Sequence, residues 1–186
     1  MTSFLASDLV VLHQPALLAA TATSLAIGLF VILTHAWHGK FTSDVAGNIQ
    51  SAHIHPTPRI GGLGIYVSLC AAYHFIEQPD VKEMLQIILI AGIPAWLFGL
   101  LEDVTKRISV LLRLLATICS GLVACHLSGT ALSRLDVPLI DHLLQWWPAA
   151  VLFTAFAVGG IANSINIIDG YHGLSSGTSM LAFLSF

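Results

Sequence analysis

The chain has 186 residues and a formal net charge of −3, with 56% hydrophobic and only 9% charged residues. Because a soluble domain carries about 25% charged residues, this composition predicts an integral membrane protein. Seven basic residues scattered along a chain of negative net charge exclude a nucleic-acid-binding protein.

Stretches without Asp, Glu, Lys or Arg mark the expected membrane spans, since about 20 helical residues cross a bilayer core. Five such stretches cover residues 9–39, 60–76, 84–101, 114–133 and 142–168, and a sixth apolar segment occupies 174–186. The first stretch follows no basic segment and lacks a persuasive cleavage site, so it is expected to be a retained span rather than a signal peptide. The fold class is therefore all-α, a polytopic bundle of five complete spans and the start of a sixth.

The loops between these spans differ in their content of Lys and Arg. The loops 36–59, 102–113 and 163–173 together contain five basic residues, Lys40, Arg59, Lys106, Arg107 and Arg113, whereas the loops on the other side contain two, Lys82 and Arg134. The positive-inside rule therefore predicts that the first set is cytoplasmic and that the N-terminus lies outside.

The first of the three cytoplasmic loops runs His53-Ile54-His55-Pro56-Thr57-Pro58-Arg59-Ile60-Gly61-Gly62. Its two prolines favour an extended path, and His55 and Arg59 are candidates to bind a phosphate or carboxylate group. The alternative is a plain turn into a helix, with Arg59 acting only as a membrane anchor.

The second loop begins with two adjacent carboxylates, Glu102 and Asp103, at the end of a span. Such a pair is costly there unless it is solvated, paired or bound to a cation. An ordinary salt bridge from Asp103 to Lys106 or Arg107 on the same helical turn is one interpretation. The functional interpretation is an acidic pair that lies near magnesium or handles a proton.

The third loop contains the most informative pattern, four polar residues spaced three apart: Asn163, Asn166, Asp169 and His172. On a helix such residues share one face, so they form a polar stripe at the end of an apolar span. Capping of the helix end explains one such residue and not four. Carboxamides, a carboxylate and an imidazole suit a divalent cation or a phosphate-bearing ligand.

Together, the segments 56–62, 99–103 and 163–174 resemble the polyprenyl-phosphate N-acetylhexosamine-1-phosphate transferase superfamily, glycosyltransferase family 4. This family includes the phospho-N-acetylmuramoyl-pentapeptide transferases and the undecaprenyl-phosphate GlcNAc-1-phosphate transferases. The resemblance implies transfer of a sugar-1-phosphate, expected to be HexNAc-1-phosphate, from a UDP-sugar to polyprenyl phosphate. UMP is released, and the product initiates a cell-envelope polysaccharide.

The resemblance also implies roles for single residues. Glu102 and Asp103 match the family's acidic pair, and Asp169 matches a carboxylate of the catalytic pocket. Asn166 matches a magnesium ligand, with manganese as an alternative ion. His172 falls where the family places a residue that contacts the nucleotide.

Substrate binding is further assigned to three residues of the first and third loops, His55, Arg59 and Asn163. The resemblance places the protein in the bacterial inner membrane with its active-site loops cytoplasmic, and a homodimer is among the assemblies it allows.

The chain departs from the family in three ways. Glu102 stands where many members have Asp, and His172 stands where peptidoglycan-type members have Asp, which favours a GlcNAc-type or O-antigen branch. The family also has further spans, with a second metal-binding aspartate and a histidine-rich loop. Residues 1–186 are therefore expected to be the N-terminal part of the transferase domain, a truncated form that is inactive alone.

Two other interpretations remain open on the residues alone. One is a small transporter or channel whose Asn/Asp/His stripe lines a cation path, which predicts a stripe near the bilayer midplane and paired repeats. The other is a non-catalytic remnant that is stable only when missing helices complement it.

Overall fold

The computed structural model describes residues 2–42, 59–168 and 173–185. Across these residues the regular elements are α-helices, which confirms the all-α prediction. In chain order they are α1 (Thr2–Leu33), α2 (His35–Thr42), α3 (Gly61–Phe75), α4 (Pro79–Thr105), α5 (Val110–Ser128), α6 (Pro138–Leu144), α7 (Trp147–Ile168) and α8 (Leu174–Leu184).

Four helices of the described chain are long and apolar enough to cross a membrane: Gln14–Leu33 within α1, and the whole of α4, α5 and α7. The span expected over 60–76 is the 15-residue helix α3. At 1.5 Å per residue α3 is about 22 Å long, which is shorter than a hydrocarbon core of about 30 Å. The sixth apolar segment forms the 11-residue helix α8.

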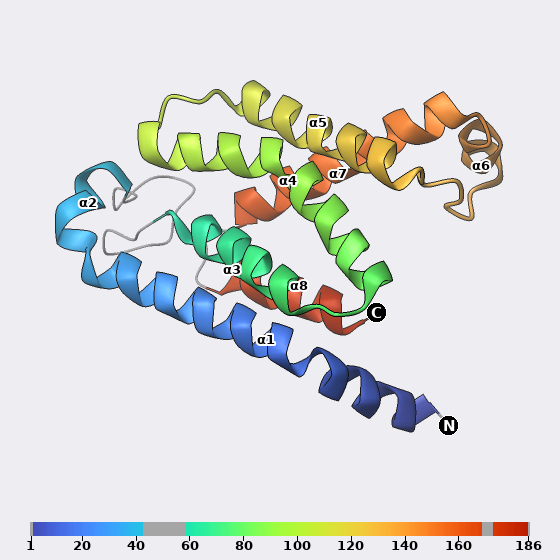
Figure 1. The fold of residues 1–186 in the computed structure, drawn as a ribbon. Helices are drawn as coiled ribbons and strands as arrows, with labels where there is room; N and C mark the ends of the chain where they lie inside the picture. Colours follow the sequence, from blue (N-terminus) through green and yellow to red (C-terminus); the bar gives the residue numbers. More distant parts are fainter. Residues whose placement is uncertain (1, 43–58, 169–172, 186) are drawn as a thin grey trace.

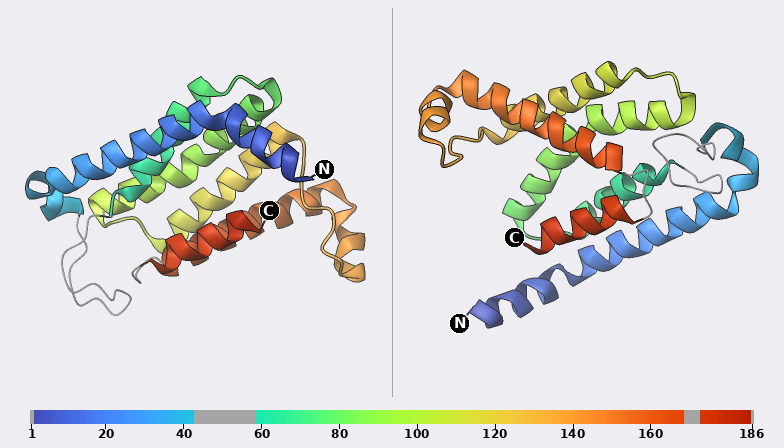
Figure 2. Two further views of the ribbon diagram at one scale, coloured as in Figure 1. Left: turned by 90° about the horizontal axis from the view of Figure 1, so that it is seen from below. Right: turned by 180° about the vertical axis from the view of Figure 1, so that it is seen from behind.

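The helices pack in the order of the chain, α1 on α3, α3 on α4, α4 on α5 and α5 on α7. The left view of Figure 2 shows α1, α3, α4 and α5 following one another across the molecule. The buried positions are mainly small residues, such as Ala72, Ala91 and Ala155. Small residues let helix backbones approach closely, as is common where helices associate in a membrane.

Large apolar side chains point away from the bundle. Phe30, Leu152 and Phe156 are 65%, 64% and 66% exposed. In water so many exposed side chains of this kind would be unfavourable, whereas lipid tails solvate them. The structure therefore supports a multi-pass membrane protein.

Helix α4 bends along its length, as Figure 1 shows, and it carries Pro94 in its interior. Proline lacks an N–H and crowds the preceding turn, so it kinks a helix. Neighbouring helices bond to the backbone beside the bend. Ser120 Oγ accepts from the Ala95 N–H at 3.0 Å, and Tyr66 donates to the Leu89 carbonyl at 2.9 Å. These bonds tie α3 and α5 to the bent helix.

Candidate functional site

The turn between α4 and α5 brings the charged ends of these two helices together. Helix α4 ends at Thr105, and Lys106 adopts a left-handed conformation whose N–H bonds to the Glu102 carbonyl. Ser109 then caps α5 by accepting from the Leu112 N–H at 3.2 Å. A short turn with a left-handed residue at one helix end and a serine cap at the next is an efficient way to reverse the chain. It places Glu102 beside Arg113.

Arg113 and Glu102 form a close ion pair across this turn. Arg113 Nη1 lies 2.8 Å from Glu102 Oε1 and 2.7 Å from Oε2. The two side chains are 13% and 19% exposed, so little water screens the pair. A charge-assisted bond in such a setting is stronger than one at a fully solvated surface.

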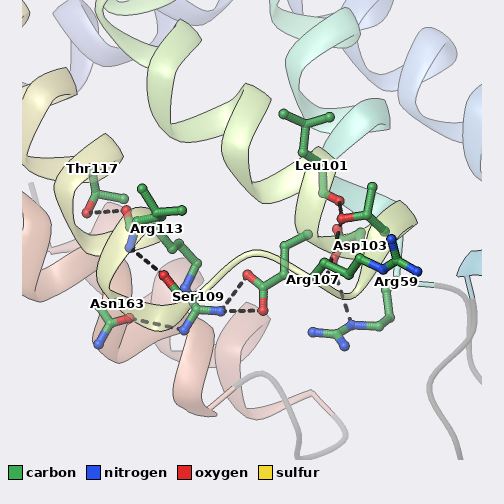
Figure 3. A network of polar contacts seen from close by, with 11 residues as sticks. Arg59, Leu101, Asp103, Arg107, Ser109, Arg113, Thr117 and Asn163 are labelled. Carbon is green, nitrogen blue, oxygen red and sulfur yellow. Dashed lines mark hydrogen bonds and ion pairs between the residues drawn. The ribbon is translucent and has the colours of Figure 1, made fainter.

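The same guanidinium reaches helix α7 and its polar stripe. Arg113 Nη2 donates to Asn163 Oδ1 at 3.2 Å (Figure 3). With its carboxamide oxygen toward the guanidinium, Asn166 accepts from Nη1 at 3.0 Å and from Nη2 at 3.3 Å. Asn163 and Asn166 are three residues apart on one helix face, as the sequence predicts. Arg113 thus joins α4, α5 and α7 in one cluster.

Close packing of α5 against α7 sets the register of this cluster. A Cβ at Gly121 would lie 2.7 Å from the Ala155 Cα, and a Cβ at Gly159 would lie 2.7 Å from Ile118 Cγ1. The two helices are antiparallel, so the eight residues from Gly121 back to Arg113 correspond to the eight residues from Ala155 forward to Asn163 along α7. The glycine contacts therefore bring Asn163 level with Arg113.

A second ion pair lies beside the first. Arg59 Nε, in the segment just before α3, lies 3.5 Å from Asp103 Oδ1 (Figure 3). Because successive helical residues point about 100° apart, Glu102 and Asp103 serve different neighbours. Glu102 faces α5 and α7, and Asp103 faces the entry to α3. The ion pair between Arg59 and Asp103 therefore links the end of α4 to the segment before α3.

The structure brings together five of the predicted site residues, Glu102, Asp103, Arg59, Asn163 and Asn166. The other three, His55, Asp169 and His172, lie outside the described residues.

Arg113 is the residue that the sequence prediction missed, because it was counted only as a loop charge that sets orientation. A signal was present. Arg113, Thr117 and Gly121 recur every four residues in an otherwise Leu-rich segment, which marks a face of α5 that packs against another helix.

The cluster offers oxygen donors of the kind that magnesium binds. Glu102 supplies a carboxylate, and Asn163 and Asn166 supply carboxamide oxygens. Within the described ranges there is no group of three or more His, Cys, Asp or Glu residues placed to hold a metal ion. The donor chemistry fits a divalent ion, and here the guanidinium of Arg113 contacts these oxygens instead.

The fold and this cluster define a multi-pass helical membrane protein with a charged polar site at one end of its bundle. The family model for glycosyl transferase family 4 matches residues 85–186, just over half of the chain. The chain belongs to this family. No solved structure matches it significantly.

Curated relatives match most of this chain. It is 26% identical to the decaprenyl-phosphate N-acetylglucosaminephosphotransferase of Mycobacterium leprae over 91% of this chain and 43% of that protein. It is 26% identical to the undecaprenyl-phosphate alpha-N-acetylglucosaminyl 1-phosphate transferase of Yersinia pestis, over 73% of this chain and 36% of the relative. The phospho-N-acetylmuramoyl-pentapeptide-transferase of Desulfitobacterium hafniense is 29% identical over 70% of this chain and 42% of its own length. The chain thus spans about two fifths of the curated relatives it matches.

Proposed function

We propose that this chain forms part of an enzyme that transfers HexNAc-1-phosphate from a UDP-sugar to a polyprenyl phosphate and releases UMP. The observation that carries the proposal is the Arg113 cluster. It joins Glu102 of the acidic pair to Asn163 and Asn166 of the stripe. The names of the relatives, which include phosphotransferases acting on decaprenyl and undecaprenyl phosphate, support the same reaction class.

The proposed roles follow from the charges of the substrates. Two phosphorylated substrates bring several negative charges together, and Arg59 is a suitable partner for one of their phosphates. Asp103 lies beside Arg59, where a carboxylate can orient or accept a proton from the acceptor phosphate. The second pKa of a phosphate monoester is about 6, so the acceptor is mostly ionised at pH 7 and needs no strong base. Asp103 is therefore proposed as an orienting group rather than a covalent nucleophile.

The remaining assignments extend the same proposal. Asn166 would hold magnesium, or manganese in its place, and Asp169 would supply a carboxylate of the catalytic pocket. His55, Asn163 and His172 would contact substrate. A bound divalent ion neutralises phosphate charge and favours in-line displacement. The site would face the cytoplasm of a bacterial inner membrane, where nucleotide sugars are found, and the product would initiate a cell-envelope polysaccharide such as O-antigen.

A transfer assay tests this proposal. Membranes containing the protein expressed from its complete gene are incubated with polyprenyl phosphate, magnesium and radiolabelled UDP-GlcNAc or UDP-GalNAc. We expect UMP and a labelled lipid to appear together. Asp103→Asn should lower both by about 100-fold or more, because it removes the charge of a group at the reacting phosphates.

The matched control is Asp136→Asn. Asp136 is 76% exposed and pairs with Arg134 at the opposite end of the bundle, so its loss should leave transfer unchanged. Absence of both products with every UDP-HexNAc, from a protein that is folded in the membrane, would contradict the proposed function.

A further inference from the structure

Four oxygen atoms from two helices converge on one guanidinium. Both carboxylate oxygens of Glu102 lie within 2.8 Å of Arg113 Nη1, and the carboxamide oxygens of Asn163 and Asn166 lie within 3.3 Å of Nη1 or Nη2. Such a set of hard oxygen donors around one positive charge is the usual surrounding of a divalent cation. In this protein the positive charge belongs to a side chain.

These contacts do not use all the hydrogen-bond donors of the Arg113 guanidinium. Within the described part of the chain, Arg113 Nε is buried and has no hydrogen-bond partner. A buried N–H without a partner is rare and calls for an explanation, since a well-fitted structural arginine uses all its donors. The terminal nitrogens are therefore held by the oxygens of α4 and α7 at the expense of Nε.

The dipoles of α4 and α5 do not stabilise the ion pair between Arg113 and Glu102. Arg113 is near the N-terminus of α5 and Glu102 is near the C-terminus of α4. The helix dipole disfavours a cation such as Arg113 near a helix N-terminus and an anion such as Glu102 near a helix C-terminus. The pair is therefore stabilised by its hydrogen-bonding partners and not by its position on the helices.

We propose that Arg113 is the resident cation of this cluster and that a divalent ion competes with it for the oxygens of Glu102 and Asn166. The inference rests on the proposed function only for the identity of the ion, magnesium. The Arg113 guanidinium and a divalent ion bound to the same oxygens would repel each other. They would also compete for the lone pairs of those oxygens. Arg113 therefore weakens metal binding while it holds α4, α5 and α7 together before the metal arrives.

Metal binding to purified protein in detergent tests this competition without any transfer reaction. Binding of Mn²⁺ is followed by electron paramagnetic resonance, and the thermal unfolding midpoint is measured with and without Mg²⁺. Arg113→Met should tighten Mn²⁺ binding by about tenfold or more, because it removes a positive charge and releases the oxygen donors. Without metal, Arg113→Met should lower the unfolding midpoint by about 5 °C or more. Addition of Mg²⁺ should raise the midpoint of this variant by more than it raises the midpoint of the native protein.

Arg134→Met is the matched control. Arg134 is 79% exposed and pairs with Asp136 in the loop before α6, far from the cluster. This variant should match the native protein in Mn²⁺ affinity and in its response to Mg²⁺.

Mn²⁺ affinity that is unchanged or weaker in a folded Arg113→Met protein would overturn the proposal. If Arg113→Met does not fold, Arg113→Lys decides the question. A single ammonium keeps the charge but cannot reach all the acceptors, so Mn²⁺ affinity should rise by a smaller factor, and no rise overturns the proposal. Tighter Mn²⁺ binding without sugar-phosphate transfer would leave the competition standing and remove the proposed function. Sugar-phosphate transfer by the native protein, without tighter Mn²⁺ binding in Arg113→Met, would support the proposed function and overturn the competition.

Discussion

Among single residues, the two ion pairs of the site differ in what they contribute. The pair between Arg113 and Glu102 is short, largely buried and extended by two carboxamides. Removing one partner of such a pair leaves an uncompensated charge, which costs roughly 3 kcal/mol or more. The pair between Arg59 and Asp103 is longer, at 3.5 Å, and its side chains are 32% and 22% exposed. A longer and more exposed pair contributes less to stability.

We expect Arg59→Ala to separate a role in ligand binding from a role in stability. A partly exposed pair contributes about 1 kcal/mol or less, so the unfolding midpoint should fall by no more than about 3 °C. Sugar-phosphate transfer should fall by about tenfold or more, because a phosphate partner is lost. Differential scanning fluorimetry and the transfer assay measure the two effects.

Arg59→Lys provides the comparison, since it keeps the charge without the planar fork and should retain intermediate activity. Full transfer by Arg59→Ala would return Arg59 to the role of a simple membrane anchor.

At the scale of elements, the contact between α5 and α7 determines where the site residues meet. Gly121 and Gly159 allow the two backbones to approach, and the antiparallel register then places Asn163 level with Arg113. The bend of α4 at Pro94, bonded by Tyr66 and Ser120, connects this pair of helices to α3. The cluster is thus a product of helix packing and not of one motif.

Substitution of Gly121 should separate the helices. In Gly121→Ala the new methyl group would meet the Ala155 Cα at 2.7 Å, and a backbone atom cannot move aside as a flexible side chain can. Overpacking of this kind costs about 1–3 kcal/mol. We therefore expect a lower unfolding midpoint and reduced transfer.

Gly160→Ala on the facing helix is the control for this substitution. Among the described residues, a Cβ there meets nothing within 4 Å, and alanine favours a helix by up to about 1 kcal/mol over glycine. Its midpoint should be equal to or above that of the native protein. Equal effects of the two variants would show that close packing of α5 on α7 does not position the site.

On the scale of the whole molecule, the charged cluster lies at the end of the bundle opposite α6 (Figure 1). The basic residues of the chain favour the same end, five against two in the expected loops. The positive-inside rule then predicts that this end faces the cytoplasm.

Cysteine labelling in intact bacterial cells tests the orientation. In a variant whose native Cys70, Cys119 and Cys125 are replaced by serine, single cysteines are introduced at the exposed positions Lys106 and Arg134. A membrane-impermeant maleimide should label Arg134→Cys in intact cells and Lys106→Cys only after permeabilisation. The opposite pattern would invert the topology and place the cluster outside.

The expected spans show which helices can be predicted from hydropathy alone. Uncharged stretches predicted α1, α4, α5 and α7, because length and apolarity alone decide whether a helix can cross a bilayer. They did not predict α6, which begins at Pro138 in a segment expected to be a loop. The polar residues at the ends of α4 and α7 were predicted to belong to a site, because clustered polar groups at the end of an apolar span need a partner.

The identity of those partners was decided only by the tertiary structure. The amino-acid sequence by itself determined an all-helical membrane protein and the candidate residues Glu102, Asp103, Asn163 and Asn166, since these depend on local composition and helical spacing. The partners of Asn163 and Asp103 are Arg113 and Arg59, which are 50 and 44 residues away in the sequence. Such pairings depend on which helix faces meet and in what register, and these are properties of packing between distant segments.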